Sequence, residues 1–188
     1  MYRFPVEGQT INIPVTANVQ YSISMEGAQG WLTYGDDQLQ IARANGQTNS
    51  HWTTGVKFEA GKWYHVALTY NKGTGSAKVY VNGELKAENG SWANATVNLS
   101  QYCRISKSYD NSRYIEGCLS EIRVWSVERT AEEIAANMYE YNGDKTNLLG
   151  YWRLNEGSGN TVSDHSGHNQ TLTANANLVW EKISLPEE

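Results

Sequence analysis

Several aromatic residues stand in polar, turn-rich stretches, where a ring has little apolar surface to pack against. Two are tryptophans, Trp52 in NGQTNSHWTT and Trp92 in ENGSWANATVNLSQ, and two are tyrosines, Tyr109 and Tyr114. Such a ring can stack on the face of a sugar while neighbouring polar side chains hydrogen-bond the hydroxyl groups. The alternative is that a loop tryptophan covers the edge of the core.

Polar side chains that suit this chemistry lie near these rings in the sequence. Asn49 precedes the first tryptophan, and Asp110, Asn111 and Arg113 stand between the two tyrosines. Three other tryptophans, Trp63, Trp125 and Trp152, lie in strand-like stretches and are interpreted as structural. The predicted ligand-binding set is therefore Trp52, Trp92, Tyr109, Tyr114, Asp110 and Arg113.

Paired carboxylates would indicate a different chemistry, because glycosidic hydrolysis normally needs two of them roughly 5–9.5 Å apart. The nearest pair, Glu116 and Glu121, is five residues apart. On a regular strand an odd separation sends two side chains to opposite faces. We expect Glu121 and Arg123 to form a solvated outer row, with Ile122 and Val124 in the core. The prediction is a non-catalytic protein.

Histidine offers little metal chemistry here. His165 and His168 lie three residues apart in DHSGH, a Gly- and Ser-rich stretch, and two histidines are too few for a zinc site. We interpret that stretch as a surface turn. His65 lies in a strand-like stretch and is expected to be structural, with its ring nitrogens hydrogen-bonded by neighbours.

Calcium is the one cofactor that the sequence leaves as a possible ligand. Calcium prefers several oxygen ligands from loops, and Asp164 with Ser163, Ser166 and Asn169 offers such a cluster, as does Asp36-Asp37. The alternative is that Asp and Asn occur in tight turns because they hydrogen-bond their own backbone. No metal ligand is assigned, and a structural calcium is the minority expectation.

The two cysteines are a testable local feature. Tyr102–Ser106 and Ile115–Trp125 are predicted to be paired strands linked by the polar loop Lys107–Tyr114. In that pairing Cys103 and Cys118 could lie opposite one another and form a disulfide, as suits an exported protein. The alternatives are two buried thiols, or strands that lie in different sheets. Neither outcome is preferred.

Composition limits the function classes. The chain has 188 residues, seven Trp, twelve Tyr and a net charge of −5, and its 15 Lys and Arg form no run. A nucleic-acid partner is therefore not expected. No stretch approaches the roughly 20 apolar residues of a membrane span. Nothing at the start resembles a signal peptide, so any export signal is expected to have been removed.

The hydrophobic pattern predicts many short strands. The clearest stretch is Gly61–Glu88, where two-residue alternation is interrupted by NKGTG and by Asn82-Gly83, which suits a tight hairpin turn. One helix is expected from the capping box at Thr130–Glu133 to Asn142-Gly143. Turns every eight to twelve residues favour a single antiparallel two-sheet sandwich. Further strands are predicted at Tyr2–Pro14, Tyr21–Met25, Trp31–Tyr34, Leu39–Ala42, Leu148–Leu154, Gln170–Thr173 and Leu178–Ile183, and Asn45–Thr54 is interpreted as a loop.

Several of these stretches also resemble a known family. The motifs are GKWYHVALTY, VYVNGE, YIEGCLSEIRVW, EEIAANM and LLGYWRLNEGSGNTVSDHSG. Together they resemble the laminin-G-like jelly roll of the concanavalin A-like lectin/glucanase superfamily. The resemblance covers most of the chain and is strongest from Gly61 to Gly167.

The resemblance also implies what to look for. The hydrolase branch of the superfamily carries a Glu-x-Asp-x-x-Glu pattern, which this sequence lacks. The YWRLNEGSG…DHSG segment often leads such domains and here trails, so the order of the closing strands is an open question. The family's Asp-Glu pair appears here as Ser120-Glu121, which removes one carboxylate that could bind calcium.

The prediction is one all-β, concanavalin A-like jelly roll over residues 1–188 with one short helix. We expect a non-catalytic carbohydrate-binding module of an extracellular, periplasmic or cell-surface bacterial protein, bound to a glycan and joined to other domains, with no membrane insertion. An adhesive or spacer domain without a sugar ligand is the first alternative. A glycoside hydrolase is the second.

Overall fold

The computed structural model describes eleven parts of the chain, with side chains at Leu39 and from Trp52 onward except in 102–105. These parts are residues 2–3, 6–7, 22–26, 30–35, 38–42, 51–59, 62–71, 74–90, 102–105, 118–174 and 176–182. No helix of these residues is long and apolar enough to cross a membrane.

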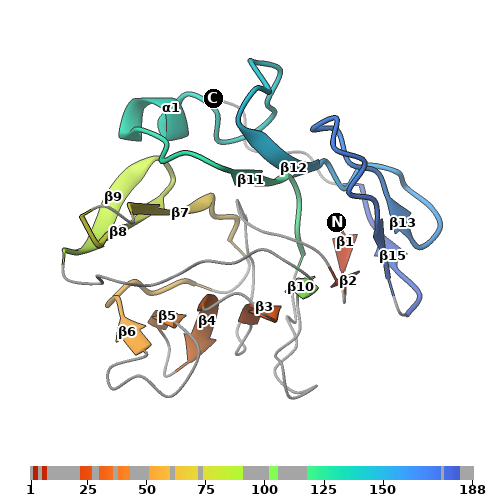
Figure 1. Ribbon diagram of the computed structural model, residues 1–188. Coiled ribbons are helices and arrows are strands. Elements are labelled where there is room, and N and C mark those ends of the chain that lie inside the picture. The colour runs from red at the N-terminus through yellow and green to blue at the C-terminus, as the bar shows by residue number, and fades with distance from the viewer. Residues whose placement is uncertain are drawn as a thin grey trace.

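One layer of the molecule is a six-stranded antiparallel sheet in the spatial order β2-β10-β3-β4-β5-β6, along the bottom of Figure 1. Its strands are β2 (Val6–Glu7), β3 (Ser22–Glu26), β4 (Gly30–Gly35), β5 (Gln38–Ala42), β6 (His51–Thr53) and β10 (Tyr102–Ile105).

The opposite layer holds a three-stranded sheet and a two-stranded sheet, which lie along the top of Figure 1. The first consists of β7 (Val66–Asn71), β8 (Ser76–Val81) and β9 (Glu84–Asn89), and the second of β11 (Ile122–Trp125) and β12 (Leu148–Trp152). All pairings are antiparallel. The predicted two-sheet β-sandwich with one short helix is therefore confirmed.

Two small strand pairs complete the fold. β13 (Thr161–Val162) pairs with β14 (Leu172–Thr173), and β1 (Tyr2–Arg3) pairs with β15 (Val179–Trp180). The first and last described strands of the chain thus lie together, which answers the question of the closing strand order. β1 and β2 do not form a hairpin, because they belong to different sheets.

The β7-β8-β9 meander confirms the clearest sequence prediction. Asn82 and Gly83 join β8 to β9 with φ angles of 50° and 79°, which only residues that tolerate the left-handed region adopt readily. A Cβ at Gly83 would lie 3.0 Å from the Cβ of Ala135. Glycine is thus needed both for the turn and for the close approach of the helix.

The main core lies between the two layers. Leu39 from the six-stranded sheet packs in it with residues of the opposite layer and of the C-terminal strands. Its fully buried members are Leu39, Ala77, Val79, Leu119, Ile122, Leu154 and Val162, with relative exposures of 0%.

The helix α1 (Ala131–Ala135) is shorter than predicted. It begins with the predicted capping box: Glu133 N–H donates to Thr130 Oγ1 at 3.2 Å, and Thr130 N–H donates to Glu133 Oε2 at 2.9 Å. It ends at the C-cap residue Ala136. The side-chain amide of Asn137 donates to the Glu133 carbonyl at 2.7 Å, and the backbone N–H of Asn137 donates to the Ile134 carbonyl at 3.2 Å, which makes a tighter turn. The predicted continuation to Asn142-Gly143 is wrong.

Two predictions about strands near the sheet edges are also wrong. His51–Thr53 was expected in a loop and forms β6, the edge strand beside β5. β10 was expected to pair with the strand ending at Trp125, but it pairs with β2 and β3, and β11 pairs with β12. The two strands therefore lie in different layers.

Candidate functional site

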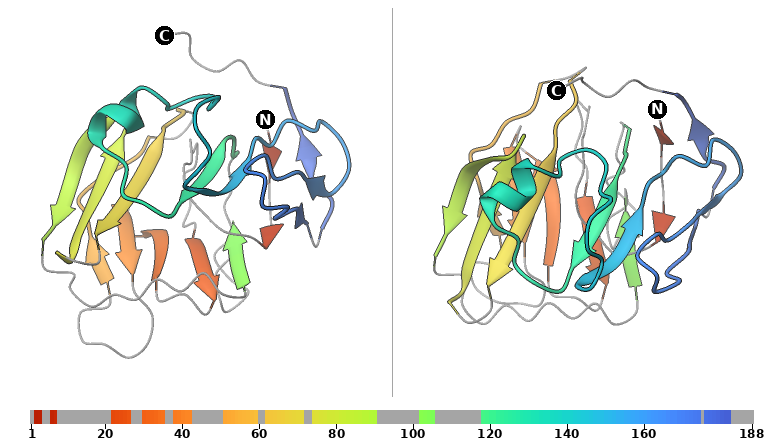
Figure 2. Two further views of the ribbon diagram at one scale, coloured as in Figure 1. Left: turned by 45° about the horizontal axis from the view of Figure 1, so that its top comes forward. Right: turned by 90° about the horizontal axis from the view of Figure 1, so that it is seen from above.

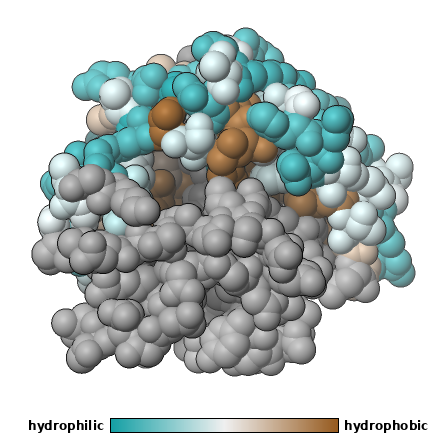
Figure 3. All heavy atoms as spheres, viewed as in Figure 1, coloured by the Kyte–Doolittle hydropathy of each residue, from teal (hydrophilic) through white to brown (hydrophobic). Residues whose placement is uncertain are grey.

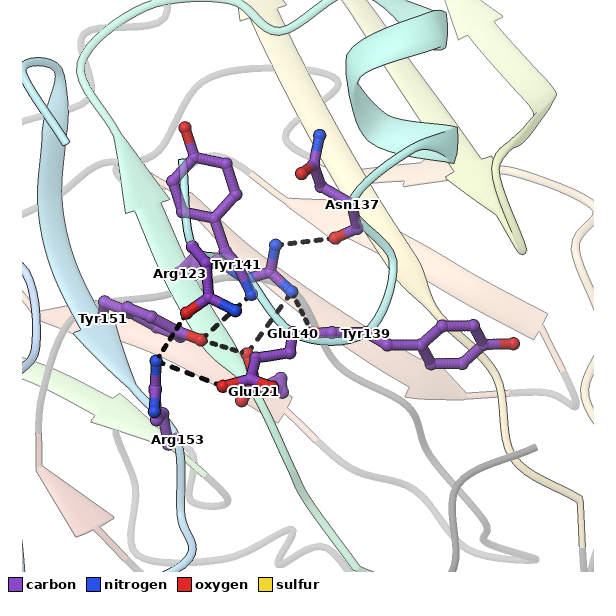
Figure 4. Close-up of polar contacts among 9 residues, drawn as sticks. Glu121, Arg123, Asn137, Tyr139, Glu140, Tyr141, Tyr151 and Arg153 are labelled. Atoms are coloured by element: carbon purple, nitrogen blue, oxygen red, sulfur yellow. Dashed lines mark hydrogen bonds and ion pairs between the residues drawn. The ribbon is translucent and has the colours of Figure 1, made fainter. Parts of the chain in front are cut away.

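Arg123 of β11 and Glu121, the residue before β11, belong to a buried network on the outer face of the upper layer (Figure 4). Ile122 and Val124 face the core, as predicted. Glu121 and Arg123 were expected to be solvated, but they are only 7% and 1% exposed. The reason is that α1 and the connection after it, residues 136–147, cover this face of the sheet (Figure 2). We call that connection the strap.

Arg123 ties the strap to the sheet. Its guanidinium donates to the carbonyls of Asn137 at 2.6 Å and Tyr139 at 2.5 Å. It lies 5.7 Å from the ring centre of Tyr141 and 5.6 Å from that of Tyr151, within cation–π range. One buried cation therefore satisfies two backbone carbonyls of a segment that has no regular structure of its own.

Glu121 completes the network. Tyr151 Oη donates to Glu121 Oε2 at 2.7 Å and accepts from Tyr141 N–H at 3.2 Å, and Arg123 Nη2 lies 3.5 Å from the same carboxylate oxygen. Burial raises the pKa of Glu121 to about 7, although Tyr151 and Arg123 oppose that shift. Burial also raises the pKa of Tyr151 to about 12.

The solvent side of the network is formed by Arg153. Its Nη2 lies 3.2 Å from Glu140 Oε1 and donates to Asn142 Oδ1 at 3.1 Å. Arg153 therefore contacts strap side chains at the solvent-exposed edge, whereas Arg123 contacts strap carbonyls in the buried interior. Glu140 is exposed. This ion pair is accordingly worth little by itself, and the buried contacts hold the strap.

His65, the residue before β7, is also buried and lies near Arg123. It is 5% exposed, and neither ring nitrogen has a hydrogen-bond partner among the described residues. The prediction that neighbours satisfy its ring nitrogens is therefore wrong. Burial lowers the pKa of His65 to about 4, and the nearby charge of Arg123 adds to that shift.

This network has the pKa shifts of a catalytic site but not its accessibility. Its carboxylate is occupied by a tyrosine and an arginine beneath the strap. Among the residues that the structure describes, no three His, Cys, Asp or Glu side chains group as a metal site would require. The arrangement can position and fasten a segment of chain.

Asp164, the centre of the predicted calcium cluster, organises a turn. Its Oδ1 accepts from Tyr151 N–H at 2.9 Å and Ser166 N–H at 2.8 Å. Its Oδ2 accepts from Ser166 Oγ at 2.7 Å and Gln170 N–H at 2.9 Å. The pKa of Asp164 is lowered by these hydrogen bonds, against the opposing and largest single effect of burial. The DHSG motif thus fastens the turn to β12.

We predict a large effect from removing this acceptor. Asp164→Ala leaves four donors without their partner and is expected to cost about 2–4 kcal/mol of unfolding free energy, measured by urea denaturation. The matched control is Asp144→Ala, because Asp144 is exposed and its side chain accepts hydrogen bonds from Thr146 alone among the described residues. A loss no larger than that of the control would contradict the role given to Asp164.

Of the six predicted ligand-binding residues, the structure describes only Trp52. It lies in β6, not in a loop, is half-buried, and packs against the main core. Its neighbour Thr53 is exposed. The arrangement agrees with the alternative interpretation, a tryptophan that covers the core edge.

The other five predicted residues lie outside the described residues: Trp92, Tyr109, Asp110, Arg113 and Tyr114. The topology still separates them into two groups. The segment with Trp92 enters β10 at Tyr102, and the segment with the other four leaves β10 at Ile105. The two segments therefore join opposite ends of one strand.

The cysteines lie on the two layers of the sandwich. Cys118 is buried beside β11, and Cys103 lies in β10, paired in register with Met25. A bond between them would cross the core from sheet to sheet, not between paired strands. The disulfide stays a prediction.

Comparison with known proteins places this fold. A family model described as the concanavalin A-like lectin/glucanases superfamily matches residues 9–135. The chain belongs to that superfamily. The predicted family is thereby confirmed. Glu121 and Arg123 lie within the matched part, whereas their partners on the strap and on β12 follow it. No curated protein matches the sequence of this superfamily member.

Solved structures agree with the superfamily fold. A candidate carbohydrate-binding protein from Bacteroides ovatus ATCC 8483 matches with a TM-score of 0.67 and 23% identity, over 96% of this chain and 61% of its own. A heptameric SAP-like pentraxin from Limulus polyphemus matches with a TM-score of 0.57 and 14% identity, over 94% of this chain and 88% of its own. At these identities the likeness concerns the fold.

Proposed function

We propose that this chain is a non-catalytic carbohydrate-binding module of an extracellular or cell-surface bacterial protein. The observation that carries the proposal is its superfamily fold, shared over 96% of the chain with the Bacteroides candidate carbohydrate-binding protein. That protein is longer than this chain, which accords with a module that works beside other domains.

The state of Glu121 supports a non-catalytic role. It is the one described carboxyl group whose pKa is raised to about 7, as a general acid would require. Its carboxylate is nevertheless held by Tyr151 and Arg123 under the strap. A sugar could not reach it unless the strap moved.

The segments that flank β10 supply the proposed contacts. The segment after Ile105 contains Tyr109, Asp110, Arg113 and Tyr114. These four fall within six consecutive residues and combine two aromatic rings with one anionic and one cationic side chain. Trp92 on the segment before Tyr102 forms a separate candidate contact. We give Trp52 less weight, since its ring packs on the core.

The proposal is tested on a glycan array, with and without calcium. We expect the wild-type chain to bind a glycan in both conditions. Tyr109→Ala/Tyr114→Ala and Trp92→Ala are compared separately, and Tyr139→Ala on the strap is the matched aromatic control. Loss of binding of about tenfold or more, or 1.4 kcal/mol, in one loop variant would place the site.

The opposite result is equally informative. If the wild-type chain binds no glycan in either condition, the carbohydrate-binding proposal is wrong and an adhesive or spacer role takes its place. Hydrolysis of any bound glycan would instead favour the glycosidase alternative.

A further inference from the structure

Four asparagines of this chain are followed directly by glycine, and such a pair can react with itself. The backbone nitrogen of the glycine attacks the side-chain amide carbon of the asparagine, and glycine has no side chain to hinder that approach. Asn82-Gly83, Asn89-Gly90 and Asn142-Gly143 lie within the described residues, and Asn45-Gly46 lies outside them. The structure gives the three described pairs very different surroundings.

The first two pairs are held by regular structure. Asn82 lies in the β8–β9 turn, where its N–H donates to the His65 carbonyl at 2.8 Å and its Oδ1 accepts from His65 N–H at 2.9 Å. Asn89 is the last residue of β9 and pairs in register with Ala77 of β8. Ring closure requires the backbone to rotate until the glycine nitrogen faces the amide carbon, and the hairpin and the strand pairing oppose that rotation.

The third pair, Asn142-Gly143, lies in the strap, where the chain has no regular structure. Both residues are exposed, and Gly143 N–H donates to no described residue. Exposed polar segments of this kind fit the mostly hydrophilic character of the described surface (Figure 3). The Gly143 nitrogen is therefore free to lose its proton to water and to act as the nucleophile.

Contacts within the strap explain why this pair is retained. A Cβ at position 143 would lie 2.7 Å from Tyr141 Oη and 2.8 Å from Tyr141 Cζ, closer than side chains pack. Tyr141 cannot easily move away, because it is buried and its Oη donates to the Asp144 carbonyl at 2.7 Å. Asn142 supplies the acceptor for Arg153. The fold thus keeps an Asn-Gly pair at an exposed, irregular position.

Arg153 contacts the atom on which negative charge develops in this reaction. Its Nη2 donates to Asn142 Oδ1 at 3.1 Å. A guanidinium has donors only, so the contact turns the amide oxygen of Asn142 toward Arg153 and the amide nitrogen away. Attack on the amide carbon makes that oxygen an oxyanion, which a cationic donor already in place stabilises. The donor to Asn82 is a neutral backbone N–H instead.

We propose that Asn142 is a site of intramolecular deamidation that Arg153 promotes. The Gly143 nitrogen gives its proton to water and bonds to Cγ of Asn142, and the bond from Cγ to Nδ2 breaks as ammonia leaves with a proton taken from water. Water then opens the cyclic imide at either carbonyl and yields aspartate or isoaspartate. The inference concerns the strap and does not depend on the proposed carbohydrate-binding function.

The product changes how the strap is held. It carries a second carboxylate beside Arg153, which already pairs with Glu140. The isoaspartate form also lengthens the strap backbone by a methylene group. The reaction is slow and runs in one direction, so the charge at this edge of the strap would record the age of the molecule.

The test is incubation of the full chain at neutral pH, followed by tryptic peptide mapping with mass spectrometry. Lysines and arginines separate the three described pairs, so Asn82 and Asn89 serve as references on peptides of their own. Arg153→Met removes the cationic donor. Glu140→Gln is the matched control, because it removes the carboxylate partner of Arg153 and leaves the contact with Asn142. If Arg153→Met does not keep the wild-type urea midpoint, Arg153→Gln takes its place.

We expect Asn142 to deamidate about tenfold faster or more than Asn82 and Asn89, and Arg153→Met to slow Asn142 by about three- to tenfold while the two reference sites keep their rates. Equal rates at the three sites of the wild-type chain would overturn the assignment of Asn142. A faster or unchanged reaction at Asn142 in Arg153→Met would show that Arg153 restrains the amide or is indifferent to it, and would overturn its promoting role. An equal slowing in Glu140→Gln would also overturn that role, since the donor is still present there.

Discussion

An Arg123→Met variant is expected to lose about 3–5 kcal/mol of unfolding free energy, the usual effect of breaking a buried ion pair from one side. Methionine can fill much of the volume of the arginine stem. It leaves the carbonyls of Asn137 and Tyr139 without their donor, and each unsatisfied buried group costs about 1–3 kcal/mol. It also removes the cation that contacts Glu121 beneath the strap.

Two further variants separate these contributions. Arg123→Lys keeps the charge but has no planar fork with which to reach both carbonyls, so an intermediate loss is expected. Adding Glu121→Gln to Arg123→Met removes the uncompensated carboxylate and should recover part of the loss. The coupling of the two changes in a double-mutant cycle should be of order 0.5–3 kcal/mol.

Urea denaturation followed by tryptophan fluorescence is applied to five proteins: the wild type, Arg123→Met, Arg123→Lys, Glu121→Gln and the double variant. If the unfolding free energy of Arg123→Met lies within about 0.5 kcal/mol of the wild-type value, the usual range of surface substitutions, the strap does not depend on this residue. If Arg123→Met does not fold, the lysine variant and the coupled pair still decide the matter.

The parts of the fold that were predicted from the sequence are those with local causes. The β8–β9 hairpin depends on Asn82-Gly83, which few other residue pairs could replace at these φ angles. The start of α1 depends on Thr130 and Glu133, which bond each other within one turn. Both signals lie within four residues of the structure they produce.

The parts that were predicted wrongly depend on distant segments. Alternation places Glu121 and Arg123 on the face away from the core, but it cannot say whether another segment covers that face. The strap that covers this face is held by Arg123 through the carbonyls of Asn137 and Tyr139, and the alternation of β11 does not indicate contacts with such distant residues. Arg123 between Ile122 and Val124, followed by a capping box, is the combination that could have raised the question.

The candidate site shows the same limit. Trp52 was selected because polar residues surround it in sequence, whereas its strand pairing with Ile41 brings it to the core face.

The stability of the wild-type chain is expected to change little with pH between about 4.5 and 6.5, because two buried groups under the strap act in opposite directions. Glu121 has its pKa raised from 4.5 to about 7 by burial. Folding therefore favours its protonated form, and its contribution is fully present below pH 4.5 and is lost as the pH rises through 7. His65 has its pKa lowered from 6.5 to about 4. Its contribution is present above pH 6.5 and is lost as the pH falls through 4.

Single substitutions should expose these opposing slopes. In Glu121→Gln the lowered pKa of His65 is left unopposed, so the unfolding free energy should fall toward acid pH. In His65→Gln the raised pKa of Glu121 is left unopposed, so the unfolding free energy should fall toward neutral pH. At about 1.4 kcal/mol per pKa unit, each change is of order 3 kcal/mol across its window. The double variant should regain a nearly level profile.

The measurement is a series of urea midpoints from pH 4 to pH 8 for the four proteins. The slopes carry the information, because a constant loss from altered packing shifts a profile without tilting it. The charged and titratable neighbours, Arg123, Arg153, Glu140 and Tyr151, stay in place in every variant. Slopes of the same sign in the two single variants would show that the strap does not enclose both groups. Opposite slopes would show that the strap keeps the carboxyl group protonated and the imidazole neutral over one shared range of pH.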